Sequence, residues 1–319
     1  MLNQKKIAVH SGTFHADDVF SVACLTGLME YSGAEIVRTR DPEVLAGCDI
    51  RVDVGGELNP NAKTFDHHQR GGAGERANGI PYAGFGLIWD EFGRQLLKEQ
   101  FPMIADEDLD EVWEIVDERL VQQVDAGDCG FSLATEWAVE GCTPYTISHL
   151  ISALNPSWNG DQSPAAFARQ FEHAVEGIAR PALDIEIQRA CDTVDANVLA
   201  RKALADAEDK RVVILERFHP WGDVLIEETD EAQFVVFANP DGEWMVQAIP
   251  PEKGSFAQRT PLPASWAGKR GEELSALLDL PGSIFVHPGR FIGGHKTREG
   301  AIRMAEMALK LSGWGEIQS

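Results

Sequence analysis

The 319-residue sequence has few cysteines, few basic residues and no long hydrophobic run. Its five cysteines are odd in number and form no Cys-X-X-Cys pair, which indicates reduced thiols in a cytoplasmic compartment. No stretch approaches the roughly 20 apolar residues of a membrane span, and the first residues lack the apolar segment of a signal peptide. We therefore expect a soluble, cytoplasmic protein with no membrane partner.

Acidic residues are in clear excess. Lys and Arg number 28 against 51 Asp and Glu, so the formal net charge is -23. General binding of long duplexes needs a basic face, so this charge argues against long duplex DNA as a partner. Phosphorylated substrates are not excluded, because bound divalent cations reverse the local charge inside an acidic cleft. Much of this acidity is typical of a solvated protein surface.

The chain is long enough for two domains of about 150 residues, and its 44% hydrophobic content is enough for a packed core. Residues 1–155 predict an α/β domain with a mostly parallel sheet, 156–210 a helical connector, and 211–319 a smaller α+β domain. The predicted helices span 17–29, 83–97, 106–124, 145–155, 164–208 and 297–311. The predicted strands span 7–9, 35–40, 49–54, 64–65, 212–215, 234–237, 244–249 and 284–286.

Histidines and aspartates follow three of the predicted strands. His10 to Asp18 follow the first strand, Asp53 follows the apolar run 50–52 of the third, and Asp66-His67-His68 follow the fourth. Ligands of such sheets collect outside the carboxyl ends of the strands, so we expect these side chains to meet. Imidazole with carboxylate is the ligand set of Mn²⁺, Fe²⁺ or Zn²⁺ in hydrolases.

Each cluster alone has an ordinary explanation, since His–Asp pairs are common hydrogen-bonded pairs. Burying several carboxylates together without cations is unfavourable, however, and the set is larger than the three protein ligands of a catalytic zinc. We therefore expect two divalent ions with a bridging carboxylate, Mn²⁺ ahead of Mg²⁺ or Zn²⁺. The candidate residues are His10, His15, Asp17, Asp53, Asp66, His67, His68 and Asp125.

These motifs resemble the DHH phosphoesterase superfamily and, more closely, the MYG1 (UPF0160) family. The shared segments are His-Ser-Gly-Thr-Phe-His-Ala-Asp-Asp at 10–18, Asp-Val-Gly-Gly at 53–56, Phe-Asp-His-His-Gln-Arg at 65–70, Leu-Asn-Pro-Ser-Trp-Asn at 154–159, Val-Gln-Ala-Ile-Pro at 246–250, Ser-Phe-Ala-Gln-Arg at 255–259 and Phe-Ile-Gly-Gly-His at 291–295. The resemblance runs from residue 7 to about residue 308. His15 stands where DHH enzymes have their first Asp, which leaves the choice of metal open.

The resemblance also implies roles for the site residues. A first metal would be held by His10, His15 and Asp53. A second metal would be held by Asp17, the bridging Asp53, His67 and Asp125. The catalytic group would be completed by His68, facing the substrate phosphate, and by Asp66 and Asp18, orienting the ligands. Asp128 is the alternative to Asp125, which is favoured on motif position only.

Residues 287–303 are locally basic, and the resemblance implies that their glycine-rich segment grips the substrate. The candidate substrate-binding residues are Arg70, Arg290, Gly293, Gly294, His295 and Lys296. The alternatives are a tight turn with solvated basic residues in this segment and a salt bridge for Arg70. Asn155 and Trp158 either line the cleft or serve as a helix cap and a core aromatic.

The resemblance thus implies a two-domain, metal-dependent phosphodiester hydrolase, a 3′–5′ exonuclease that uses metal-activated water on single-stranded RNA or short oligonucleotides. A small-molecule phosphatase or pyrophosphatase and a regulatory metal-binding protein without catalysis remain alternatives. Peptide hydrolysis is disfavoured because the sequence has no His-Glu-X-X-His motif. The oligomeric state stays open, with a homodimer as one possibility.

Overall fold

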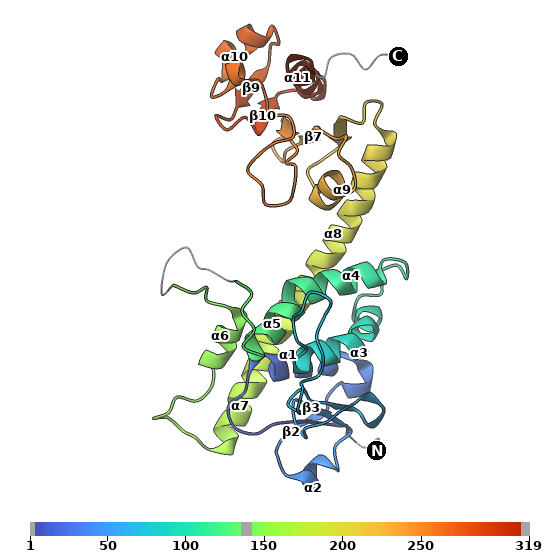
Figure 1. Cartoon of the computed structure of the whole chain (residues 1–319), viewed down its shortest axis with the longest axis vertical. Helices are drawn as coiled ribbons and strands as arrows, with labels where there is room; N and C mark the ends of the chain where they lie inside the picture. The colour runs from blue at the N-terminus through green and yellow to red at the C-terminus, as the bar shows by residue number, and fades with distance from the viewer. Residues whose placement is uncertain (1–3, 135–141, 314–319) are drawn as a thin grey trace. The chain divides into compact units, whose positions relative to one another are not determined.

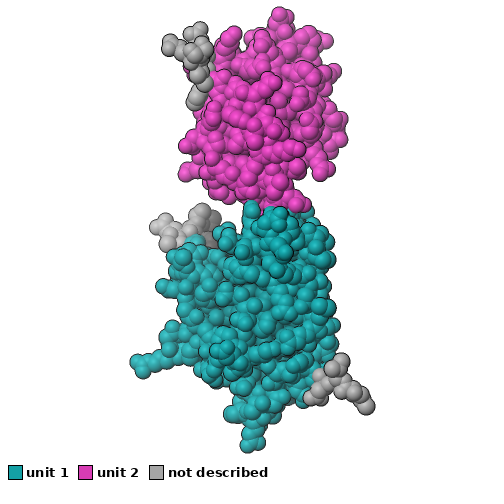
Figure 2. All heavy atoms as spheres, turned by 90° about the vertical axis from the view of Figure 1, so that its right-hand side faces the viewer, with its two compact units in different colours: residues 1–192 teal, residues 193–319 magenta. Residues whose placement is uncertain are grey.

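A computed structural model describes residues 4–134 and 142–313 of the chain (Figure 1). The chain divides into two compact units, residues 1–192 and 193–319 (Figure 2). The boundary lies inside α8 (Arg180–Asp206), so the residues expected to form a separate connector are shared between the units. Among the described residues, no helix combines the length and apolar character needed to cross a membrane.

The first unit contains a five-stranded sheet in the order β2-β1-β3-β5-β4. Its strands are β1 (Lys6–Val9), β2 (Glu35–Arg38), β3 (Ile50–Val52), β4 (Leu58–Asn59) and β5 (Thr64–Phe65). β1, β2, β3 and β5 pair in parallel, and β4 pairs antiparallel with β5. The carboxyl ends of β1, β3 and β5 therefore lie at the same edge of the sheet, as the sequence predicts.

The helices of this unit pack mainly against one another. They are α1 (Ala16–Gly27), α2 (Pro42–Leu45), α3 (Gly84–Gln100), α4 (Leu109–Val116), α5 (Gln122–Asp128), α6 (Ile147–Ala153) and α7 (Pro164–Ala174). α1 is buried from Ala16 to Leu25, which fits its apolar sequence and its packing against α3. A π-helical turn, Asp117–Val121, joins α4 to α5, so the helix predicted over 106–124 extends to Asp128.

The second unit also contains a five-stranded sheet, in the order β6-β7-β8-β10-β9. Its elements are β6 (Val212–Leu215), α9 (Gly222–Glu227), β7 (Phe234–Ala238), β8 (Trp244–Ala248), α10 (Gly271–Leu278), β9 (Ser283–Val286), β10 (Ile292–His295) and α11 (Arg298–Leu311). β6 and β7 are parallel and the other pairs antiparallel. The mixed α/β fold class, with one sheet in each of two units, is confirmed.

One segment of the second unit differs from expectation. The sequence analysis left residues 293–295 as either a glycine-rich segment that grips the substrate or a tight turn, but they form β10, which lies between β8 and β9. A Cβ at Gly293 would lie 3.1 Å from the carbonyl oxygen of Phe285, and one at Gly294 would lie 2.9 Å from the Met245 methyl carbon. The glycines therefore permit close packing within the sheet, and their backbone groups take part in strand pairing.

Candidate metal centre

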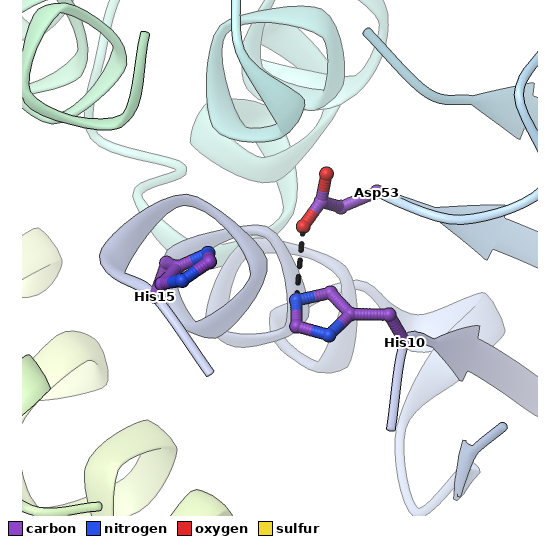
Figure 3. A group of neighbouring side chains, drawn as sticks. All are labelled: His10, His15 and Asp53. Carbon is purple, nitrogen blue, oxygen red and sulfur yellow. Dashed lines mark ion pairs between the residues drawn. The ribbon is translucent and has the colours of Figure 1, made fainter. Parts of the chain in front are cut away.

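Side chains from three strand ends and two helices converge at the edge of the first sheet. His10 follows β1, Asp53 follows β3, and His15 is the N-cap of α1. Figure 3 shows His10 and Asp53 pointing toward each other, with His15 beside them. The ring centroids of His10 and His15 are 5.6 Å apart. The meeting of these residues, predicted from their positions after strands, is present in the structure.

Asp53 lies at the middle of this group. Its Oδ2 atom is 3.2 Å from His10 Nε2, and its Oδ1 atom is 3.1 Å from both His67 Nε2 and His68 Nδ1. Its backbone has a φ of +53°, a left-handed conformation that is uncommon for a residue with a Cβ. Such conformations persist where surrounding structure holds them and are concentrated at functional sites. The turn after β3 therefore presents one buried carboxylate to three imidazoles.

Asp17 and Asp128 form a second part of the group around His67. His67 Nε2 lies 3.2 Å from Asp128 Oδ2 and 3.7 Å from Asp17 Oδ2. His15 Nδ1 lies 3.5 Å from Asp128 Oδ1. Four overlapping sets have ligand atoms within 4.8 Å of one another: His10–His15–Asp53, Asp53–His67–His68, His67–Asp128–Cys129 and His15–Asp17–Asp128. The neighbouring sets are joined through shared residues.

Several polar atoms in this group are buried and make no hydrogen bond of good geometry among the described residues, although imidazole nitrogens lie 3.1–3.2 Å from the Asp53 oxygens. They are Asp17 Oδ1, Asp18 Oδ2, both carboxylate oxygens of Asp53, and His67 Nε2. Leaving such atoms without partners is costly, and that cost is larger for charged groups. The donor set of imidazole nitrogens and carboxylate oxygens suits divalent transition metals. The residues therefore fit a bound divalent cation.

The pKa values report crowding of negative charge. Burial, and then the nearby Asp53 and Asp128 carboxylates, raise the pKa of Asp17 well above its usual value. Burial also disfavours ionised Asp53, but contacts with His10, His67 and His68 outweigh it and lower the pKa of that carboxyl. Burial opposes protonation of His10, yet Asp18 and Asp53 raise its pKa to about 10. The carboxylates thus favour protonation of the imidazoles, and a cation that binds here must displace those protons.

Two further residues hold imidazoles in place. Asp18 lies 3.2 Å from His10 Nε2 and accepts a 3.0 Å hydrogen bond from the His15 backbone N–H. Asp66 accepts a 3.0 Å hydrogen bond from the His68 N–H and lies 2.9 Å from His68 Nδ1.

Cys129 Sγ lies 3.8 Å from His67 Nδ1 and belongs to a ligand set with His67 and Asp128. Cys129 was not among the site residues predicted from the sequence. Its position directly after Asp128 would have indicated it only once Asp128 was placed at the centre.

Asp125 is engaged elsewhere. Its Oδ2 atom accepts a 2.9 Å hydrogen bond from Arg76, and its Oδ1 atom accepts one from the Gly86 N–H at 2.9 Å. Burial raises the pKa of this carboxyl to about 7, even though the charge of Arg76 lowers it. Asp125 thus belongs to no described ligand set, whereas Asp128, the alternative considered from the sequence, belongs to two.

The start of α3 also contributes to the centre, which sequence reasoning missed. The Gly84 N–H donates a 3.1 Å hydrogen bond to Asp17 Oδ2, and a Cβ at Gly84 would lie 2.9 Å from that oxygen. Glycine is therefore required for this close approach. The paired glycines of Ala-Gly-Phe-Gly at 83–86 were the available signal, since glycine is unfavourable inside a helix unless packing requires it.

The proposed substrate-binding residues are divided between the two units. Arg70 is exposed in the first unit, and Lys296 is exposed and Arg290 half-buried in the second. His295 is buried, with Nε2 3.1 Å from the Pro281 carbonyl oxygen and Nδ1 accepting a 3.0 Å hydrogen bond from the Thr297 N–H. His295, like Gly293 and Gly294, therefore has a packing role within its unit, and substrate contact by these six residues stays a prediction.

Comparison with known proteins identifies the family. The model of the MYG1 exonuclease family, described as uncharacterised protein family UPF0160, matches residues 6–309. The chain belongs to the MYG1 family. The MYG1 protein of Schizosaccharomyces pombe is 38% identical, with 97% of this chain and 98% of that protein covered. The MYG1 exonuclease of Mus musculus is 37% identical, with 95% of this chain and 84% of that protein covered.

The MYG1 exonuclease of Homo sapiens is 36% identical, with 95% of this chain and 85% of that protein covered. Membership of the MYG1 family, predicted from the motifs, is confirmed. A crystal structure of an uncharacterized Helicobacter pylori protein aligns with 96% of this chain and 99% of that chain at 10% identity. Its TM-score of 0.22 is too low to support any comparison of the folds.

Proposed function

We propose that this MYG1 family member is a divalent-metal-dependent phosphodiester hydrolase that acts as a 3′–5′ exonuclease on RNA or short oligonucleotides. The observation that carries the proposal is the convergence of Asp17, Asp53 and His67, whose buried polar atoms make no hydrogen bond of good geometry among the described residues. The mouse and human relatives are named MYG1 exonuclease, which supports the same reaction class. The DHH-like order of the motifs along the chain adds support.

We assign one cation to His10, His15 and Asp53, and a second to Asp17, Asp53, His67 and Asp128. This assignment replaces Asp125 with Asp128, because Arg76 occupies the Asp125 carboxylate. Bound cations, with Mn²⁺ as the first choice, would supply an activated water and Lewis acidity toward the phosphate ester. Asp53 is the proposed shared ligand, since its two oxygens face different histidines.

His68 is the proposed contact to the substrate phosphate. Its side chain is 59% exposed, whereas that of Asp53 beside it is buried, so the ring lies between the ligands and solvent. Contact with Asp53, and then with Asp66, raises the pKa of His68. A protonated imidazole held in this position can donate a hydrogen bond to a phosphate oxygen as negative charge develops. Asp66 and Asp18 are the proposed positioning residues for His68 and for His10 and His15.

The net negative charge of the chain supports the proposed substrate class. A chain with 51 acidic and 28 basic residues has little basic surface for a long duplex, so short or single-stranded substrates are favoured. Cys24, Cys48, Cys129 and Cys142 are free thiols, which fits the proposed cytoplasmic location.

The decisive experiment compares Asp53→Ala with the wild type in a Mn²⁺-supplemented assay of 5′- and 3′-labelled oligoribonucleotides. We expect removal of Asp53 to lower hydrolysis at least about a hundredfold, because catalysis by a metal ion is worth several kcal/mol. The fold should persist, since the change removes one member of a crowded set of carboxylates. Asp106→Ala, which removes an exposed surface acid, is the matched control and should retain full activity.

Three outcomes would count against the proposal. Retained hydrolysis by Asp53→Ala would remove the shared ligand from the mechanism. Turnover of nucleoside bisphosphates or pyrophosphate without turnover of oligonucleotides would indicate a small-molecule phosphatase. Tight Mn²⁺ binding without cleavage of any phosphate ester would indicate a regulatory metal-binding protein.

A further inference from the structure

The loop that joins α6 to α7 presents a fully accessible aromatic side chain. Trp158 is 90% exposed, so the core-aromatic alternative for this residue is wrong. Figure 1 shows the loop projecting from the side of the first unit. A single exposed apolar residue needs no special explanation by itself. What distinguishes Trp158 is how its loop is held and where the loop is attached.

The loop is ordered by its own hydrogen bonds. The carbonyl oxygen of Ser157 accepts a 2.8 Å hydrogen bond from the Gly160 N–H and a 2.7 Å hydrogen bond from Gln162 Nε2. The Ser157 hydroxyl donates to Asn159 Oδ1 at 2.9 Å. These contacts form a compact turn from Ser157 to Gln162, and Trp158 is one of its residues. The indole is therefore displayed on an ordered turn, and little conformational entropy of the backbone is left to lose when a ligand binds.

The same loop is hydrogen-bonded to the residue that precedes His15. Asn155 Oδ1 accepts a 3.0 Å hydrogen bond from the Phe14 N–H, and Asn155 Nδ2 donates a 2.9 Å hydrogen bond to the Phe14 carbonyl oxygen. Phe14 directly precedes the proposed ligand His15. Asn155 and Trp158 are three residues apart, so their Cα atoms can be separated by at most about 11 Å. The loop that carries the exposed indole is consequently attached next to a proposed ligand of the centre.

The neighbours of Trp158 indicate what it contacts. The residues beside Trp158 in the sequence, Ser157, Asn159, Gly160 and Asp161, are polar or lack a side chain, so this part of the loop adds no apolar surface of the kind that binds proteins or membranes. A lone aromatic face in polar surroundings suits a nucleobase, which is flat above and below and polar at its edges. Stacking also needs no positive charge, of which this chain has little.

We propose that Trp158 stacks on one nucleobase of a single-stranded oligonucleotide whose phosphate lies at the metal centre. This inference rests on the proposed function and adds to it a residue that binds a base and does not take part in the chemistry. Stacking on an aromatic side chain tolerates every base, so Trp158 selects unpaired strands over duplexes, whose bases are covered by pairing and stacking.

The test measures kcat and KM for Mn²⁺-dependent cleavage of a short oligoribonucleotide by Trp158→Ala and Trp158→Phe. We expect Trp158→Ala to raise KM between about fivefold and about 150-fold with little change in kcat, the range measured for removal of one stacking partner. Trp158→Phe should recover most of the affinity. Ile185→Ala, which removes another exposed apolar side chain, should leave KM unchanged and serves as the matched control.

A scan of abasic positions along the oligonucleotide identifies the stacked base. In the wild type, one abasic position should raise KM, and in Trp158→Ala that position should have no further effect. An unchanged KM in Trp158→Ala, or equal additional losses at every abasic position, would overturn the inference and leave the proposed function standing. A wild-type protein that neither binds nor cleaves any oligonucleotide would overturn both.

Discussion

Asp125 and Asp128 show how two carboxylates three residues apart on one helix can have different roles. Asp125 is buried against Arg76 and the first turn of α3. Asp128, the last residue of α5, reaches His67 and His15. A motif position alone does not distinguish them, because the choice depends on Arg76, which is 49 residues away from Asp125 in the sequence.

This assignment predicts that Asp125→Asn lowers stability, whereas Asp128→Asn removes metal binding. Asp125→Asn leaves Arg76 with an incomplete set of buried partners, so it should lower the free energy of unfolding by about 3 kcal/mol. Asp128→Asn should largely preserve stability but abolish tight Mn²⁺ binding and hydrolysis. Urea denaturation in the presence of a chelator and calorimetric titration with Mn²⁺ measure the two effects. Wild-type Mn²⁺ affinity in Asp128→Asn would show that Asp128 is not a ligand.

At the scale of elements, the segment from His10 to His15 is held at two points. Asn155 binds both backbone polar groups of Phe14, and Arg38 Nη2 donates a 2.7 Å hydrogen bond to the Gly12 carbonyl oxygen. The Arg38 guanidinium also lies 4.8 Å from the centroid of the Phe171 ring. Elements far along the chain therefore fix the spacing between two proposed ligands.

The hydrogen bonds between Asn155 and Phe14 give a prediction for Asn155, a positioning residue. Asn155→Ala should weaken Mn²⁺ binding about tenfold, because loss of the groups that orient metal ligands typically costs that much or more. Asn59→Ala removes the N-cap of a short 3₁₀-helix and is a control for loss of an asparagine side chain. Calorimetric titration with Mn²⁺ compares the variants. Equal affinities for Asn155→Ala and the wild type would mean that the hydrogen bonds to Phe14 have no part in metal binding.

The sequence predicted the elements that local patterns define. The β-branched runs of β1 and β3 and the helical segments of α1, α3 and α11 are present close to where they were expected. The clusters that follow β1, β3 and β5 were correctly expected to meet, because parallel pairing places those strand ends together. β10 was missed, since two glycines resemble a turn unless the packing of Phe285 and Met245 against them is known.

At the scale of the whole molecule, the chain forms two units with separate sheets, and the proposed metal ligands all belong to the first. The expected three-part division depended on the long charged stretch after Pro181. Local composition indicates that this stretch is helical but does not indicate which unit it packs against. In the structure that stretch is α8, and packing places its first part in one unit and its last part in the other.

The central claim is that His10, His15, Asp17, Asp53, His67 and Asp128 together bind divalent cations. Anomalous diffraction at the manganese absorption edge, from crystals of the full-length protein grown with Mn²⁺, tests it most directly. We expect strong anomalous peaks enclosed by these six side chains, next to Asp53. Anomalous density located only elsewhere, or its absence from this group at saturating Mn²⁺, would show that these side chains do not bind the cations.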